Sequence, residues 1–240
     1  MSVSSSKRNR NSNNDRRTKQ EAYVPATSTP SYNKSFKTIV PKNYIQGVYL
    51  EAIKQNDITF GTGSAGTGKT YVAAMYAAEE LFHRRIDKII ITRPNVECGP
   101  SLGFLPGELE EKYAPYLEPF ADVFKRALGV GFYEYALKSK QIDPRPMGFM
   151  RGSTFENCIL LIDECQQMSS KEFKMILSRI GNNCKVILSG DSSQSDVSNS
   201  GLDDAVRRLS YIKGIEVVNF RNEDIVRSAM CKKVIVAYED

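Results

Sequence analysis

A run of glycines between an apolar segment and a helical pattern constrains the fold of this chain more than any other feature. Residues 57–74 read DITFGTGSAGTGKTYVAA, and the segment from Gly63 to Thr70 fits the pattern GxxxxGK followed by Ser or Thr. Glycine lets such a loop wrap its backbone N–H groups around a phosphate, and a helix that starts near Gly68 adds its partial positive charge. Because a strand pattern precedes the loop and a helix pattern follows it, we expect a nucleoside triphosphate site here.

The loop offers groups for both the phosphates and a metal ion. Lys69 is expected to reach the β- and γ-phosphates, and Thr70 is expected to place its hydroxyl on Mg²⁺. The loop residues expected to bind the nucleotide are Gly63, Ser64, Ala65, Gly66, Thr67, Gly68, Lys69 and Thr70.

Short apolar runs alternate with helical patterns along most of the chain. Nearly continuous apolar runs of this kind are typical of strands that are covered on both faces. We expect strands at residues 57–63, 88–92, 158–163, 185–190 and 215–220. The alternation predicts an α/β fold in which a mostly parallel sheet has helices on both faces. A helical insertion around residues 99–156 interrupts this rhythm.

Acidic and amide side chains follow two of the expected strands. Asp163 and Glu164 end the third strand, and Asp191 and Gln194 follow the fourth. Because parallel sheets bind their ligands at the C-terminal ends of the strands, we expect these groups beside the phosphate loop. Asp163 is expected to hold Mg²⁺, Glu164 to activate the attacking water and Asp191 to bind the nucleotide. Gln194 is suited to sensing the γ-phosphate, although clusters of Ser, Asp and Gln also form ordinary turns.

Charge divides the chain into a tail and a folded part. Residues 1–36 hold seven Lys or Arg and two acids, which equals the net charge of +5 of the whole chain, so residues 37–240 sum to zero. The tail is rich in Ser and Asn, so we expect it to be disordered. It would act either as a nucleic-acid-binding arm or as a solubilising leader. Residues 37–240 are expected to form one domain.

The remaining composition argues against several classes of protein. The chain has one histidine, His83, and five cysteines without a CxxC pair. This pattern disfavours a histidine-based metal site, a structural zinc site and a disulfide framework. No apolar run approaches the roughly 18 residues that cross a bilayer, and the N-terminus lacks the apolar region of a secretory signal. We therefore expect a cytoplasmic protein without a membrane partner.

Several stretches together resemble the PhoH-like family of P-loop ATPases. They are QGVYLEAIKQNDITFGTGSAGTGKTYVA, ITRPNVECGPSLGFLPGELEEKYAPYLEPFADVF, RGSTFENCILLIDECQQM, LSRIG and LSGDSSQSD. The second is the most diagnostic, because an ATPase in general has no reason to carry LGFLPGELEEK. The resemblance covers the chain from about Pro41 to its C-terminus. It implies a RecA-like core related to superfamily 1 helicases, with ATP and Mg²⁺ as cofactors, and short versions of the family are often encoded by phages or other viruses.

The resemblance also assigns a role to Gln46. This residue matches a glutamine that reads adenine in such enzymes, and an amide can pair with the N6 and N7 edge of that base. The chain departs from the family pattern at three positions. Cys165 and Gln167 stand in DECQQM where Asp-Glu-Ala-Gln-Asn is more usual. Ser153 stands where a second arginine often follows the Arg-Gly pair, which puts one basic contact in doubt. These departures do not touch the phosphate or magnesium groups.

Without the tail, the chain has room for one RecA-like core, whereas superfamily 1 helicases close ATP between two. A second core therefore cannot supply an arginine finger in cis, and such a finger can contribute roughly 10³–10⁵ in rate. We expect a neighbouring subunit to supply it in a homo-oligomeric ring, with a hexamer favoured. The candidates are Arg227, Arg151, Arg179 and Arg221, each of which could instead be a surface arginine.

The resemblance implies single-stranded nucleic acid as the partner, with RNA as the first choice and DNA as the second. In related helicases, the region around Arg93 contacts the nucleic acid backbone. Arg93, Arg151 and the tail could form a positive path, and Tyr113 or Phe149 could stack on bases. The expected function is thus a Mg²⁺-dependent ATPase that acts as a helicase or translocase. The alternatives are a non-motor ATP-dependent switch or a nucleic-acid-binding module without unwinding and, less favoured, a small-molecule nucleotide kinase.

Overall fold

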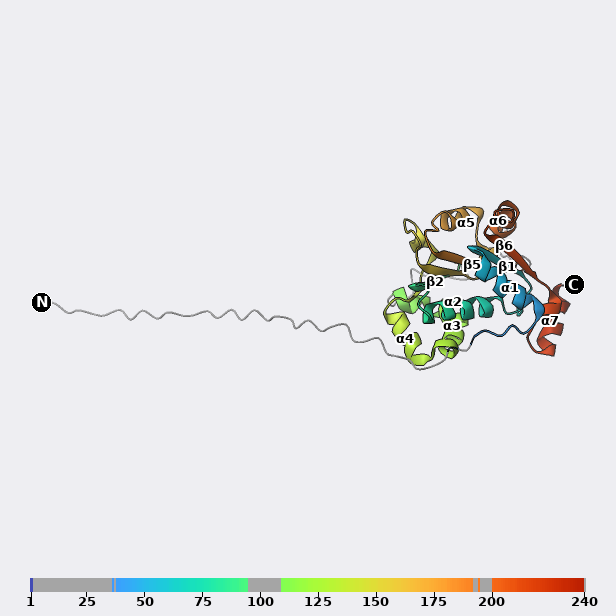
Figure 1. Cartoon of the computed structure of the whole chain (residues 1–240), viewed down its shortest axis with the longest axis horizontal. Coiled ribbons are helices and arrows are strands. Elements are labelled where there is room, and N and C mark those ends of the chain that lie inside the picture. The colour runs from blue at the N-terminus through green and yellow to red at the C-terminus, as the bar shows by residue number, and fades with distance from the viewer. Residues whose placement is uncertain (2–35, 37, 95–108, 192–193, 195–199, 240) are drawn as a thin grey trace. The chain divides into compact units, whose positions relative to one another are not determined.

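The computed structural model describes Met1, Phe36, Gln194 and residues 38–94, 109–191 and 200–239. Residues Phe36–Asp240 form one compact unit (Figure 1). The expected tail at residues 1–36 lies outside the described residues except for its two end residues, and residues 99–108 of the expected insertion also lie outside them.

A six-stranded sheet, in which all neighbouring strands are parallel, forms the centre of this unit. Its strands are β1 (Ile58–Gly63), β2 (Lys88–Thr92), β3 (Ile142–Pro144), β4 (Cys158–Ile162), β5 (Cys184–Gly190) and β6 (Ile215–Phe220). Their order across the sheet is β3-β2-β4-β5-β1-β6. The predicted α/β fold is confirmed, and the ends of the five expected strands differ from the observed ends by one residue at most.

Strand β3 lies in the expected insertion and forms one edge of the sheet, whereas the other described elements of the insertion are helical. It pairs with β2 from Ile89↔Ile142 to Ile91↔Pro144. Three residues are too few to show a periodic pattern, and a sheet tolerates proline at its edge. The sequence therefore carries no strand signal at this point.

Helices cover both faces of the sheet (Figure 1). The helices on one face are α1 (Tyr44–Gln55), α2 (Lys69–Phe82), α3 (Leu109–Leu128) and α4 (Val130–Lys138), and those on the other are α5 (Ser170–Leu177) and α6 (Gly201–Leu209). Helix α7 (Ala229–Glu239) follows β6. Among the helices in the described part of the chain, none is both long enough and apolar enough to cross a bilayer.

Alternate residues of the strands fill two hydrophobic cores. In β2, Ile89 and Ile91 belong to the core beneath α1–α4, whereas Ile90 belongs to the core beneath α5 and α6. This is the pattern expected when successive side chains point to opposite faces of a sheet. Phe120 and Phe124 of α3 are buried in the first core. Packing on both faces thus fixes the sheet, and the loops at the C-terminal ends of its strands form the site.

Candidate nucleotide-binding site

The glycine-rich loop between β1 and α2 needs glycine at several positions. Gly63, Gly66 and Gly68 have φ angles of 104°, 75° and 91°, which other residues rarely adopt. A Cβ atom at Gly63 would also lie 1.9 Å from the carbonyl oxygen of Phe220 in the adjacent strand β6. The glycines therefore permit both the turn of the loop and the close approach of β6.

Gln46 of α1 holds the loop from one side. Its side-chain amide donates to the Thr67 carbonyl oxygen (2.8 Å) and accepts from the Lys42 backbone N–H (2.8 Å). The residue is buried, with 1% of its surface exposed. The structure thus places the expected adenine-reading residue against the phosphate loop, with both ends of its amide bonded to the backbone.

The segment that follows β6 supports the loop from another side. The Val226 N–H donates to the Gly66 carbonyl oxygen (3.1 Å), and the Ser64 hydroxyl donates to the side-chain oxygen of Asn222. A Cβ atom at Gly66 would lie 2.8 Å from Cγ of Arg227. The C-terminal region therefore brings Arg227 to the phosphate loop of its own chain.

Lys69 begins α2 and folds back over the loop. Its Nζ donates to the carbonyl oxygens of Gly63 (2.5 Å) and Ser64 (2.8 Å). Burial lowers the pKa of Lys69, and the neighbouring carboxylates of Asp191 and Asp163 act in the opposite direction. The ammonium group thus lies where phosphate oxygens could replace the two carbonyl oxygens.

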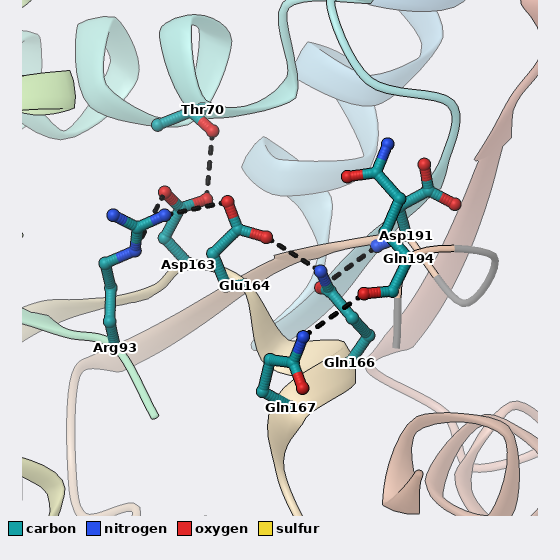
Figure 2. A network of polar contacts seen from close by, with 8 residues as sticks. All are labelled: Thr70, Arg93, Asp163, Glu164, Gln166, Gln167, Asp191 and Gln194. Carbon is teal, nitrogen blue, oxygen red and sulfur yellow. Dashed lines mark hydrogen bonds and ion pairs between the residues drawn. The ribbon is translucent and has the colours of Figure 1, made fainter. Parts of the chain in front are cut away.

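The two residues expected to bind Mg²⁺ meet between α2 and the end of β4 (Figure 2). The Thr70 hydroxyl donates to Oδ1 of Asp163 over 3.0 Å. Burial raises the pKa of Asp163, while the Arg93 guanidinium and the Thr70 hydroxyl act in the opposite direction. Hydroxyl and carboxylate oxygens are the hard ligands that Mg²⁺ prefers. The pair therefore fits the ion.

Glu164 is held by one donor at each carboxylate oxygen (Figure 2). Nη2 of Arg93 lies 2.7 Å from Oε1, and Nε2 of Gln166 lies 2.7 Å from Oε2. The backbone of Glu164 is left-handed, with φ 54°, a strained state for a non-glycine residue that is concentrated at functional sites. Arg93 also lies 3.8 Å, through Nε, from Oδ2 of Asp163. The arginine expected to contact nucleic acid is thus paired with the acids of this site.

Gln166 joins the ends of β4 and β5 and is a site residue that sequence reasoning missed. Its Oε1 accepts from the Asp191 backbone N–H (3.1 Å), and its carbonyl oxygen accepts from the Ser200 hydroxyl (2.8 Å). It is 1% exposed, so its amide is aimed by its surroundings. Two sequence signals could have indicated this role: its position two residues after Glu164, and its match to the glutamine of the Asp-Glu-Ala-Gln-Asn pattern. Gln194 is exposed, and its carbonyl oxygen accepts from Nε2 of Gln167 (3.2 Å).

A cavity of about 600 Å³ brings most of the expected nucleotide residues together, and this size is typical of ligand sites. The expected residues that line it are Gln46, Ala65, Gly66, Gly68, Lys69, Thr70, Arg93, Asp163, Glu164, Asp191, Gln194 and Arg227. Helix α3 adds a wall with Asp122 and Arg126. Sequence reasoning missed this wall, because the approach of a distant helix leaves no local signal.

The other candidate arginines do not join this group. Arg151, Arg179 and Arg221 do not line the cavity. Arg221 is exposed and lies 3.8 Å from Glu223. Arg151 is exposed near Phe149, of which 61% is exposed, and the side chain of Tyr113 lies outside the described ones.

Comparison with known proteins matches most of the chain to one family. The family model described as "PhoH-like protein" matches residues 38–239. Protein PhoH of Escherichia coli (strain K12) is 40% identical over 220 residues, which is 90% of this chain and 62% of that protein. The PhoH-like protein of Bacillus subtilis (strain 168) is 41% identical over 210 residues, which is 86% of this chain and 66% of that protein. The chain thus spans less than two thirds of the length of these relatives.

A solved structure, Pif1 helicase from Candida albicans, matches 76% of this chain and 41% of its own, with a TM-score of 0.39 and 15% identity. A likeness of this degree carries no argument about activity. The family assignment rests instead on the match over residues 38–239 and on the two bacterial relatives. On that extent of agreement, the chain belongs to the PhoH-like family.

Proposed function

We propose that this chain is a Mg²⁺-dependent, cytoplasmic ATPase that hydrolyses ATP with a water activated by Glu164. The observation that carries the proposal is the 3.0 Å hydrogen bond between Thr70 and Asp163, the two expected Mg²⁺ ligands. Both residues line the same cavity as Lys69 and Glu164. Triphosphate, metal and base would therefore meet in one place, as ATP hydrolysis requires.

Each of these groups has a separate task in the proposed reaction. Bound Mg²⁺ would supply positive charge to the β- and γ-phosphates. Lys69 would exchange its two carbonyl contacts for phosphate oxygens, while Thr70 and Asp163 would hold the ion or its water. Glu164 would accept the proton of the attacking water. Asp191 and Gln194 would contact the nucleotide from the end of β5.

Arg227 is the arginine that we propose for stabilising the charge of the transition state. It lines the cavity and lies against Gly66 of its own phosphate loop, which favours action in cis over the trans action expected from sequence. With Arg227 in cis, the ring no longer follows from the need for an arginine finger. A ring of subunits, with a hexamer favoured, remains our proposal because superfamily 1 helicases close ATP between two cores, and a neighbouring subunit would take the place of the second core. Sedimentation with and without an ATP analogue tests the ring, and full turnover by a strictly monomeric species would exclude it.

Single-stranded RNA or DNA is the partner that we propose, with Arg151 as one contact. Arg151 and Phe149 are both exposed and close in sequence, so a phosphate contact and a stacking surface could act together. Arg93 could contribute only after leaving Glu164 and Asp163. Binding of a fluorescent single strand should weaken steeply between low and physiological salt, and salt-independent binding would contradict a phosphate contact.

Phosphate release by the full chain tests the ATPase proposal. Lys69→Ala and Glu164→Gln should both abolish turnover, and Glu164→Gln should still bind ATP. Glu134→Gln is the matched control, because Glu134 is exposed on α4 and does not line the cavity. Normal turnover of Glu164→Gln would contradict the assignment of the base. Stimulation by a single strand together with strand separation would support a motor, and hydrolysis unaffected by nucleic acid would support a non-motor switch.

A further inference from the structure

Arg93 directly follows β2, and its guanidinium contacts Asp163 and Glu164, which directly follow the neighbouring strand β4. Strands β2 and β4 pair in register up to Thr92↔Ile162, so Arg93 and Asp163 emerge side by side. Arg93 then reaches both acids, at 2.7 Å from Oε1 of Glu164 and 3.8 Å from Oδ2 of Asp163 (Figure 2). In the described part of the chain, Arg93 is the one cation that forms ion pairs with these two acids.

We propose that Arg93 is the resting counter-ion of this acid pair and that Mg²⁺ displaces it when the ion arrives with ATP. The inference rests on the proposed function. Asp163 presents Oδ1 to Thr70 and Oδ2 to Arg93, so the ion and the guanidinium would share one carboxylate. Two cations at one small anion repel each other, and burial of Asp163 limits the screening of that repulsion. The divalent ion has the larger charge, so the arginine leaves.

Displacement of Arg93 also removes one of the two hydrogen-bond donors that hold the Glu164 carboxylate. With the arginine in place, a strong donor occupies each carboxylate oxygen, whereas a general base needs an oxygen that faces its water. Departure of the guanidinium frees Oε1, while buried Gln166 keeps its hold on Oε2. Arg93 is thus a positioning residue that acts through Glu164 and Asp163. Because linkage is reciprocal, removing Arg93 should make Mg²⁺ bind more tightly.

Equilibrium binding tests the proposal without relying on turnover. The full chain is mixed with a fluorescent, non-hydrolysable ATP analogue, and Mg²⁺ is titrated to find its half-saturating concentration. Arg93→Gln should lower that concentration about threefold to fivefold, the upper range for a partly exposed ion pair. Arg93→Lys keeps the charge but loses the two-pronged geometry, so its shift should be smaller and in the same direction. Mg²⁺ alone should also raise the Tm of Arg93→Gln more than that of the wild type.

Arg145→Gln is the matched control. Arg145 pairs with Asp143 at the edge of the sheet and does not line the cavity, so this change should leave the half-saturating concentration unaltered. An unchanged or higher Mg²⁺ requirement in Arg93→Gln would overturn the inference. If Arg93→Gln does not fold, an unchanged requirement in Arg93→Lys would overturn it instead. If the wild type binds no analogue at any Mg²⁺ concentration, both the proposed function and this inference are wrong. If the wild type binds the analogue in a Mg²⁺-dependent way and Arg93→Gln does not change the half-saturating Mg²⁺ concentration, only this inference is wrong.

Discussion

Replacement of Gln46 by alanine tests how the phosphate loop is held. The amide of Gln46 makes two hydrogen bonds of 2.8 Å, to Thr67 and Lys42, from a position that is 1% exposed. An unsatisfied buried group costs about 1–3 kcal/mol. The Thr67 contact is buried and the Lys42 contact partly buried, so we expect the free energy of unfolding to fall by about 2–4 kcal/mol. For a domain of this size, that loss lowers the Tm by about 5–15 °C.

Thermal unfolding followed by circular dichroism measures the effect. Gln55→Ala is the matched control, because Gln55 lies on the same helix and its amide bonds only to exposed Glu51 among the hydrogen bonds described for it. The control should change the free energy of unfolding by less than about 0.5 kcal/mol. A loss equally small in Gln46→Ala would refute the reasoning that this amide supports the loop.

Nucleotide competition with the same variant separates two roles of Gln46. If Gln46 supports the loop, its loss weakens ATP and GTP binding alike, because both nucleotides use the same phosphate site. If it reads adenine, as the family resemblance implies, its loss removes the preference for ATP over GTP. From the observed contacts we expect the affinities for both nucleotides to fall with their ratio preserved, and a collapsed ratio would contradict this expectation.

Three further outcomes follow from the geometry. Gly63→Ala should lower the free energy of unfolding by at least about 2 kcal/mol, because of its left-handed backbone and the clash with Phe220. Gly148→Ala is its control in a denaturant titration, because beyond the adjacent backbone no atom lies within 4 Å of the added carbon. Arg227→Ala should reduce phosphate release by roughly 10³-fold or more. If Arg227 acts in cis, mixing this variant with Lys69→Ala chains should not restore activity, and restored activity would show action in trans. Chelation of Mg²⁺ should stop phosphate release by the wild type, and continued release would contradict the role of Thr70 and Asp163.

Much of the fold could be predicted because the strands are short apolar runs with clear ends. The same reasoning predicted that Asp163, Glu164 and Asp191 would gather beside the loop, since parallel strands carry their C-terminal residues to one edge. Strand β3 could not be predicted in this way, because three residues that end in proline carry no pattern. The position of Arg93 depends on the order and register of the strands, which the sequence does not show. The pairing of β2 with β4 places Arg93 beside Asp163.

The parts of the site that sequence reasoning missed depend on contacts between distant segments. Arg227 was a predicted candidate, but its place on the phosphate loop of its own chain was not predicted. It reaches that loop because Val226 bonds to Gly66, and no local sequence pattern indicates this contact. Gln166 has its role because the ends of β4 and β5 are adjacent and its amide is buried between them. Local propensity specifies which elements form, whereas packing of the whole unit decides which side chains meet.

A crystal structure of the full chain with Mg²⁺ and a non-hydrolysable ATP analogue tests the central claim most directly. The account predicts that Nζ of Lys69 leaves the carbonyl oxygens of Gly63 and Ser64 for the β- and γ-phosphates, with Mg²⁺ beside Thr70 and Asp163. A nucleotide bound elsewhere, or a Lys69 that keeps its present contacts while the nucleotide is bound, would contradict it.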